Sequence, residues 1–520
     1  MPLPFLAALI LVTSLLRQGF GAASVCYANG TRSLRYIEVT IRSKAESRLL
    51  SGGKTVKIAR AVGTGCFPRS RPWPESETKA AQRCPYLIMP AQKNPKYERW
   101  RWQIFGVTWL AYAGFYLTRK AFSVAKNELK KPEVLGLTKA QMSGMDGAYS
   151  AAYALGQFFW GTLGDRYGTR RVVLFGMMAS LVTAAFMGLT STAFWMGVLF
   201  ALQGVWQASG WAPLAKNMGE FFSQRERGSV MGFWYTNYAL GGFVASIIAG
   251  YAAAWFGWRF AFLVPAGLLL LIWILFLLFQ RNRPEDAGLP PIEQYHGESE
   301  ATLEPGAPVE QEGTWKVVGD VLRNRMVWFL ASVYFLVKPT RYLLLFWSPV
   351  YISERLGTGT ATSGVLSSMF DLAGPVGTLA GGIISDKLFQ SKRMPVSVLA
   401  LFCLAALMIV FPFIPLSRTT MGIGMFLMGF LIFIPDSLIS GTAAIDFGTK
   451  KGASTANGLI NGLGSIGQLA GVMLPGSVES YLGKGHDIWP SIFVGLGVSL
   501  GLAGLLLSFQ WNRLPPKAGA

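Results

Sequence analysis

Twelve long apolar runs dominate this sequence, and they fall into two sets of six separated by a polar segment. Each run is close in length to the roughly 20-residue helix that crosses a bilayer. The chain is 52% hydrophobic and only 14% charged, which is unlike a soluble protein of this size. We therefore expect an all-α membrane protein with two six-helix bundles, at 99–280 and 326–512. The runs lie near residues 104–123, 141–163, 172–190, 192–213, 228–254, 258–280, 326–352, 362–386, 395–415, 419–445, 453–475 and 488–510.

Basic residues in alternate loops indicate the orientation. Arg166 follows the second run, Arg225 follows the fourth and Lys392 follows the eighth. Lys and Arg concentrate in the cytoplasmic loops of membrane proteins. We therefore expect both termini to be cytoplasmic, together with the linker at 281–325 and the tail at 513–520.

Residues 1–98 form an N-terminal extension without the pattern of a domain. Its first 88 residues carry 13 Lys or Arg against 4 acidic residues, and so supply +9 of the net charge of +20. One interpretation is a transit or sorting segment, which would leave an organelle membrane open. The other is that translation begins at Met89, which favours a bacterial inner membrane, and we prefer it. Three of the four cysteines lie in this extension, and neither a disulfide framework nor a metal site is indicated.

Two arginines lie deep inside apolar runs, at matching places in the two halves. Arg119 follows the uncharged run 104–118, and Arg341 lies the same distance into the run that begins at Met326. At 1.5 Å of rise per residue, this is about 22 Å into an apolar layer of about 30 Å. A guanidinium at that depth is costly unless it faces water, a partner or an anion. Two guanidinium forks suit a doubly negative ligand, so this pair is our first candidate for a substrate site.

An ion pair with an intramembrane acid is the alternative role for these arginines. Asp371 in the eighth run and Asp436 in the tenth are the available acids. Lys338 precedes Arg341 by three residues, which is about one helical turn. It either adds positive charge to the site or pairs with Asp436.

The two halves resemble each other around a charged loop. The segment GTLGDRYGTRR is echoed by GGIISDKLFQSKR in the second half, where Asp386 follows Asp165 at an offset of 221, while the two arginines lie 222 apart. Such offsets indicate a duplication, as in transporters whose site lies between repeats. The first loop, with Asp165, Arg166 and Arg170, resembles the signature loop of the major facilitator superfamily. The resemblance implies the major facilitator fold with two pseudo-symmetric bundles, and it assigns these loop charges to gating.

Further segments resemble one branch of that superfamily, the organophosphate:phosphate antiporters. They are spread over residues 100–515 and include YLTRK, GWAP, QRERG, GLPPIE and the stretch from RY to WSP in the seventh run. In that family one arginine of the first helix and one of the seventh clamp the phosphate, and these positions match Arg119 and Arg341. The resemblance also implies that Asp371 is a partner of the seventh-helix arginine, released when substrate arrives.

The sequence departs from the family at two pocket positions. Gln157 stands where the glycerol-3-phosphate transporter has a lysine on the second helix, and Tyr238 stands where it has a histidine on the fifth. The two histidines of the chain, His296 and His486, lie in loops, so we expect no histidine to titrate in the pore. The resemblance therefore leaves the organic phosphate unnamed.

Three tyrosines complete the candidate pocket. Tyr112 and Tyr116 precede Arg119 by three to seven residues and so share its helix face, and Tyr153 matches a pocket tyrosine of the family. Their hydroxyls can bond phosphate or sugar oxygens. Helix packing or an interfacial aromatic belt is the alternative role for all three.

These features predict a monomeric secondary transporter that exchanges an organic phosphate, such as glycerol-3-phosphate or a sugar phosphate, for inorganic phosphate by alternating access. A membrane sensor of sugar phosphate and a proton-coupled symporter of an organic anion remain as alternatives. We expect no enzyme, because no catalytic constellation and no GxxxxGK[ST] loop is present. For the same reason we expect no cofactor, and we expect no nucleic-acid partner.

Overall fold

A computed structural model describes residues 26–27, 36–38, 58–59, 94–295, 319, 321–389, 392–439, 453–483 and 485–512. The chain divides into two compact units, Met1–Met89 and Pro90–Ala520. In the first unit, three short strands pair antiparallel in the order β1-β2-β3, with bounds Cys26–Tyr27, Tyr36–Glu38 and Ile58–Ala59. The rest of the predicted N-terminal extension, up to residue 93, lies outside the described residues.

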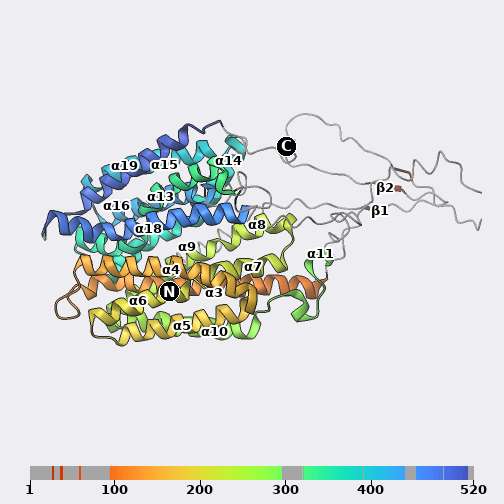
Figure 1. The fold of residues 1–520 in the computed structure, drawn as a ribbon, viewed down its shortest axis with the longest axis horizontal. Coiled ribbons are helices and arrows are strands. Elements are labelled where there is room, and N and C mark those ends of the chain that lie inside the picture. Colours follow the sequence, from red (N-terminus) through yellow and green to blue (C-terminus); the bar gives the residue numbers. More distant parts are fainter. Residues whose placement is uncertain are drawn as a thin grey trace, which may run out of the picture. The chain divides into compact units, whose positions relative to one another are not determined.

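The second unit holds two groups of helices, coloured orange to green and green to blue in Figure 1. The six predicted runs of the N-terminal half are all helical, and the fourth and fifth runs each consist of two helices. Breaks at 208–210 and at Tyr235 divide these two runs. The helices are α3 (Pro95–Leu129), α4 (Lys139–Tyr167), α5 (Thr169–Leu189), α6 (Ala193–Gln207), α7 (Trp211–Phe221), α8 (Gln224–Trp234), α9 (Thr236–Phe256) and α10 (Phe260–Phe279).

The C-terminal half repeats the arrangement after a linker that contains two short helical turns, η1 (Pro284–Ala287) and α11 (Ile292–Tyr295). Its helices are α13 (Arg325–Leu356), α14 (Thr360–Leu388), α15 (Arg393–Val410), η2 (Phe411–Phe413), α16 (Arg418–Ser437), α18 (Ala453–Leu482) and α19 (Trp489–Ser508). The last residues of the predicted run 419–445, from 440 onward, lie outside the described residues.

Seven helical segments of the described chain are long and apolar enough to cross a membrane: α5, α8 with α9, α10, α13, α15 with η2, α16 and α19. The long helices α3, α4, α14 and α18 are not among them. These four carry polar and charged groups that meet at the contact between the two bundles. Their polarity therefore marks the interior of the protein rather than a surface facing lipid.

The first helix begins earlier than the apolar run at 104 predicts. Asn94 caps α3 with its side chain, which accepts a hydrogen bond from the Lys96 backbone N–H, and Pro95 occupies the first turn. Both residues favour a helix start. Arg101 then pairs with Glu98 and with Glu226 of α8, so this polar first part of α3 is held by ion pairs.

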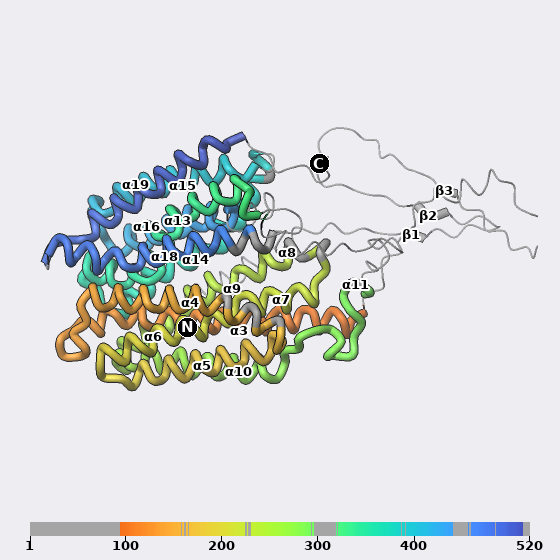
Figure 2. Tube along the Cα trace, viewed as in Figure 1, coloured from red at the N-terminus to blue at the C-terminus, as the bar shows by residue number. Residues whose placement is uncertain are grey.

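Among the described residues, the main contacts between the two bundles are those of α9 with α14 and of α4 with α18. We call the end with the loops 130–138 and 357–359 the far end, and the opposite end, where Asn94 donates to the Tyr295 hydroxyl, the linker end. Near the far end, the Asn127 side chain donates to the Pro349 carbonyl at 3.0 Å. Figure 2 shows α4 of the first bundle running beside α18 of the second. These contacts join the bundles between the level of the arginines and the far end.

Candidate functional site

The guanidinium of Arg119 is buried at the centre of the N-terminal bundle among neutral partners. Its Nε donates to Oε1 of Gln207, at the end of α6, at 2.8 Å. The group also lies over two aromatic rings, 4.3 Å from the centroid of Tyr116 and 4.9 Å from that of Tyr153. The Tyr149 hydroxyl donates to the same Gln207 oxygen at 2.8 Å. No carboxylate of the described chain forms an ion pair with Arg119.

One nitrogen of this guanidinium, Nη2, is buried and has no hydrogen-bond partner within the described structure. Arg119 as a whole is only 4% exposed. An unsatisfied buried donor on a charged group costs free energy, and an anion that accepts a hydrogen bond from it would remove that cost. The local structure therefore fits an anionic ligand at Nη2.

The second arginine has a different environment. Arg341 on α13 donates from Nη1 to Oδ2 of Asp436 on α16 at 2.6 Å. The other oxygen of Asp436 accepts a hydrogen bond from the Tyr334 hydroxyl at 2.7 Å. The guanidinium also lies over the rings of Phe433 at 4.8 Å and Tyr238 at 5.3 Å. Arg341 is therefore neutralised by an acid of its own bundle, as the alternative ion-pair role predicts.

Aromatic rings connect the two arginines. The ring of Tyr116, under Arg119, lies 6.3 Å from the ring of Tyr238, under Arg341. The ring of Tyr342, from the second bundle, lies 5.7 Å from the Arg341 guanidinium. The two arginines thus share one central region, with Tyr238 from the first bundle and Tyr342 from the second.

Lys338 is the third cation of this region. It is 5% exposed, and its ammonium donates to the Asn461 carbonyl and to the Ser465 hydroxyl, both at 3.2 Å. Both acceptors are neutral and belong to α18. Of the two roles that the sequence left open, the geometry favours added positive charge, because Asp436 pairs with Arg341.

Asp371 makes a different ion pair from the one expected. Its carboxylate lies 2.7 Å from the ammonium of Lys120, and both side chains are buried. The expected pairing of Asp371 with Arg341 is therefore wrong for this structure. The physical reason is packing: α14 approaches α9 so closely that a Cβ on Gly242 would lie 2.9 Å from the Asp371 carboxylate, which directs this acid toward the first bundle.

A second buried ion pair lies toward the far end. Lys126 of α3 contacts Asp146 of α4, and both side chains are fully buried. The same ammonium donates to the Phe346 carbonyl of α13 at 3.1 Å and lies 4.0 Å from the Trp347 ring. The sequence did not predict this pair, because Lys126 follows the apolar run by a few residues and resembles a charged residue of a loop.

Tyr112 and Gln157 are two further candidate pocket residues. Tyr112 packs against Trp211 at 5.1 Å between ring centroids and against Tyr116 at 5.9 Å, which is the packing role considered for it. Gln157 is half-buried on α4, one turn from Tyr153, and within the described part of the chain it makes no hydrogen bond. The geometry thus favours Tyr116 and Tyr153 over Gln157 as pocket residues.

The signature loop lies at the linker end of the N-terminal bundle. Arg170 donates from its backbone to the Asn282 side chain at 2.8 Å and from Nη2 to the Leu277 carbonyl at 2.6 Å. A cation at the last carbonyls of α10 is favourable, and Arg170 connects α5 to that helix end. Arg166 is exposed. The side chains of Asp165 and Asp386 lie outside what the structure describes.

Three residues of the site were missed or given no role from the sequence: Gln207, Lys120 and Tyr334. A glutamine at the end of an apolar run is a signal for a buried polar contact, and Lys120 is the neighbour of Arg119 in the sequence. Neither signal names a partner. The hydrogen bonds of Gln207 to Thr118 and Ser180 depend on how three helices are rotated against one another.

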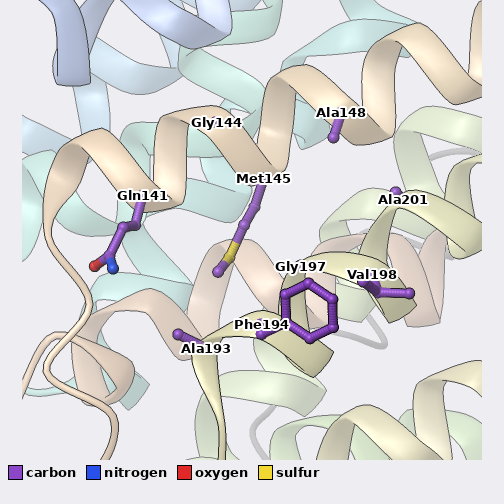
Figure 3. A pocket seen from close by; sticks show the side chains of 9 residues that line it. All are labelled: Gln141, Gly144, Met145, Ala148, Ala193, Phe194, Gly197, Val198 and Ala201. Atoms are coloured by element: carbon purple, nitrogen blue, oxygen red, sulfur yellow. The ribbon is translucent and has the colours of Figure 1, made fainter.

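A separate groove on the N-terminal bundle is not part of this site. It holds about 660 Å³ between α4 and α6 and is lined mostly by small and apolar side chains, such as Met145, Phe194 and Val198. Figure 3 shows Gln141 as the polar residue at its rim. No charged residue lines it, so it is not a site for an anion. No cluster of three metal-ligating side chains occurs in the described chain either.

Comparison with known proteins identifies the family. The sequence model of the Major Facilitator Superfamily matches residues 108–472, which is most of the chain. The chain belongs to this superfamily. It is an integral, multi-pass membrane protein of the major facilitator fold, as predicted. It resembles a solved bacterial homologue of the human lysosomal transporter Spinster, with a TM-score of 0.60 at 14% identity over 81% of this chain and 96% of that one.

The curated relatives are consistent with the organophosphate:phosphate antiporter branch of the superfamily. The glycerol-3-phosphate transporter of Bacillus subtilis is 31% identical over 81% of this chain and 95% of its own length. A probable hexose phosphate transport protein of Chlamydia pneumoniae is 29% identical, over 80% and 92%. The membrane sensor protein UhpC of Escherichia coli is also 29% identical, over 84% and 98%. These relatives are transporters and a sensor rather than enzymes.

Proposed function

We propose that this protein is a secondary active transporter that exchanges an organic phosphate for inorganic phosphate by alternating access. The observation that carries the proposal is the unpartnered Nη2 of Arg119, at the centre of a membrane protein and close to a second arginine from the other bundle. Relatives named as glycerol-3-phosphate and hexose phosphate transporters support the substrate class. A phosphate offers several acceptor oxygens that match guanidinium forks.

The charges of the site support a doubly negative substrate. Among the described residues, four cations face two acids, which leaves a net charge of +2; the cations are Arg119, Lys120, Lys338 and Arg341, and the acids are Asp371 and Asp436. Buried like charges destabilise a closed, dry site. A phosphate dianion neutralises this excess. Because closing is easier with the anion bound, exchange is favoured over the return of the empty carrier.

The two acids take the coupling roles in this mechanism. When phosphate binds Arg341, it replaces Asp436, which keeps its hydrogen bond from Tyr334. The ion pair between Lys120 and Asp371 joins the two bundles, so it forms and breaks as they rock. Asp165, Arg166, Arg170 and Asp386 gate the linker end, while contacts such as Asn127 with Pro349 close the far end in the present state.

We further propose that the linker end faces the cytoplasm, with both termini on that side, as the basic loops indicate. The far end then opens to the outside, and the present contacts correspond to a carrier closed on the outside. We place the protein in a bacterial inner membrane as a monomer. Accessibility of single cysteines at Lys96 and Lys131 to an impermeant thiol reagent in whole cells tests the orientation, because only the cysteine at residue 131 should react.

The decisive test of the function is counterflow in proteoliposomes. Vesicles loaded with unlabelled phosphate should accumulate labelled external phosphate, and an organic phosphate substrate should compete. Glycerol-3-phosphate, glucose-6-phosphate and phosphoenolpyruvate are the first competitors to test. Unchanged exchange after Arg119→Lys and Arg341→Lys would refute the role of the arginines.

A membrane sensor of sugar phosphate is the second candidate, favoured by the similarity to UhpC over nearly the full length of that protein. A sensor requires binding without turnover. Saturable phosphate binding to the purified protein without counterflow would support this candidate, and uptake driven by a pH gradient but independent of phosphate would instead indicate a proton-coupled symporter.

A further inference from the structure

We propose that Lys338 makes the central site selective for the doubly charged form of phosphate. With Lys338 present, the site accepts phosphate monoesters as dianions and rejects phosphodiesters, which carry one charge. This inference rests on the proposed function and adds the charge of the substrate to it. Lys338 would then be a specificity-determining residue, distinct from the two arginines.

The first observation concerns the groups that surround the Lys338 ammonium. Its described hydrogen bonds reach only neutral oxygens, of Asn461 and Ser465, and the side chain is almost completely buried. The ammonium also lies 5.2 Å from the ring centroid of Tyr334 and 5.7 Å from that of Tyr342. Neutral dipoles and rings stabilise a cation, while Asp436 forms its ion pair with Arg341 and not with Lys338.

The second observation is that the position of Lys338 is fixed. A Cβ on Gly464 of α18 would lie 2.9 Å from Cδ of Lys338 and 2.6 Å from the Tyr334 ring. Helix α18 therefore packs directly on the aliphatic part of the lysine. The ammonium is held near Arg341, because its ring neighbour Tyr342 also lies 5.7 Å from the Arg341 guanidinium.

The third observation is the distribution of counter-charges. Asp436 pairs with Arg341 and Asp371 pairs with Lys120. In the described site, two cations form no ion pair with a carboxylate, Arg119 in the first bundle and Lys338 in the second. These two buried cations match the two negative charges of a dianion.

The energetic consequence is discrimination by charge. A buried charge without a counter-charge is strongly unfavourable, so a monoanion bound at Arg119 leaves Lys338 uncompensated when the site closes. A dianion compensates both cations. Removing the charge of Lys338 should reverse this preference, because the site then matches a single negative charge.

The test uses two small probes that do not depend on which organic phosphate is the natural substrate. Methyl phosphate is a monoester with a second pKa near 6 and is mostly a dianion at pH 7, whereas dimethyl phosphate stays a monoanion. Each is titrated against counterflow of labelled inorganic phosphate at pH 7. The measured quantity is the ratio of the two inhibition constants for wild-type, Lys338→Met, Lys338→Arg and the exposed control Lys96→Met.

We expect wild-type to prefer the monoester by at least 100-fold, and Lys338→Met to lower this ratio at least tenfold. Lys338→Arg and Lys96→Met should keep the wild-type ratio. A Lys338→Met protein that exchanges more slowly with an unchanged ratio would overturn the proposal and leave Lys338 as a structural link between α13 and α18. If Lys338→Met does not fold, Lys338→Gln takes its place in the same measurement, and equal inhibition of the wild-type protein by both probes refutes charge selection in any case.

Failure of the proposed function has a different signature. A wild-type protein without counterflow of inorganic phosphate refutes exchange itself. In that case protection of the purified protein against thermal unfolding by the same two probes measures the charge preference of the site directly, and equal protection would refute the role of Lys338.

Discussion

Arg119 and Arg341 lie on equivalent helices of the two bundles, yet their partners differ. Arg119 is held by the amide of Gln207 and by aromatic rings and has one unpartnered nitrogen. Arg341 forms an ion pair with Asp436. The difference teaches that a duplicated fold need not have two equivalent halves of a site. The first arginine is ready to bind an anion, while the second must exchange an internal acid for the anion.

This asymmetry gives the two arginines different tasks. Binding at Arg119 needs no rearrangement of charges, so it supplies affinity. Binding at Arg341 breaks a buried ion pair, and removing one partner of such a pair typically costs 3 to 5 kcal/mol. Only a ligand of similar charge can replace the carboxylate. We infer that Arg119 provides most of the affinity for phosphate. Binding at Arg341 breaks its ion pair with Asp436 and so changes the C-terminal bundle.

The largest expected effect separates the two arginines directly. Arg119→Lys should lower phosphate exchange at least 100-fold, which corresponds to about 2.7 kcal/mol at 1.36 kcal/mol per factor of ten, because lysine cannot form the two-pronged contact. Arg341→Lys should lower it only about tenfold, since Asp436 already neutralises this position. Initial rates of counterflow with equal amounts of reconstituted protein measure both. Equal losses in the two variants would contradict the asymmetry.

Gln207→Glu should make the surroundings of Arg119 resemble those of Arg341, which pairs with an acid. The new carboxylate would pair with Arg119 and compete with phosphate, so we expect the Kd for phosphate to rise about tenfold. Isothermal titration of the purified protein measures this affinity. The thermal unfolding midpoint serves as the control for folding, and an unchanged Kd in a folded variant would show that the neutral partner of Arg119 is irrelevant.

Asp436→Asn removes the acid beside Arg341 in the second bundle, whereas Gln207→Glu adds an acid beside Arg119. Without its acid, Arg341 should bind phosphate more tightly, with a Kd lower by about five- to tenfold, while the maximal exchange rate falls because release becomes slower. The two constants come from the concentration dependence of counterflow. Asp487→Asn, at an acid near the far end that pairs with Arg355, is a matched control and should change neither. A weaker affinity in Asp436→Asn would argue that Asp436 positions Arg341 for phosphate instead of competing with it.

Tyr334→Phe tests the same competition between Asp436 and phosphate for Arg341, and its expected effect is the smallest. The hydroxyl of Tyr334 donates to one oxygen of Asp436, and a hydrogen bond to a charged group contributes about 1.5 to 3 kcal/mol. Without it, Asp436 should hold Arg341 more strongly, so the Kd for phosphate should rise about threefold. The same titration measures the effect, and a Kd below that of wild-type would have the wrong sign for this account.

Much of the fold followed from the sequence, because hydropathy records which segments lie in the membrane. The twelve runs are largely helical where the structure describes them. The sequence alone also names both arginines, Tyr116 and Asp436 as candidate site residues. Helical periodicity placed Tyr116 on the face of Arg119, and their contact at 4.3 Å confirms that geometry.

The pairing of charges could not be predicted, because it depends on how helices rotate and pack against each other. The depth of a side chain in the membrane follows from its position in the apolar run. Which neighbouring helix that side chain faces does not follow from the sequence. Asp371 was therefore assigned to Arg341, while Gly242 allows α14 and α9 to approach closely and brings Asp371 to Lys120. The neutral partner of Arg119, Gln207, was missed for the same reason.

Counterflow of labelled inorganic phosphate into loaded and empty proteoliposomes tests the central claim most directly. If the empty site carries an excess of positive charge that only a dianion removes, labelled phosphate should accumulate in vesicles loaded with unlabelled phosphate and should hardly enter empty ones. Arg119→Lys should abolish this difference. Equal uptake into loaded and empty vesicles by the wild-type protein would contradict the account, because it would show that the carrier returns empty as easily as it returns with phosphate bound.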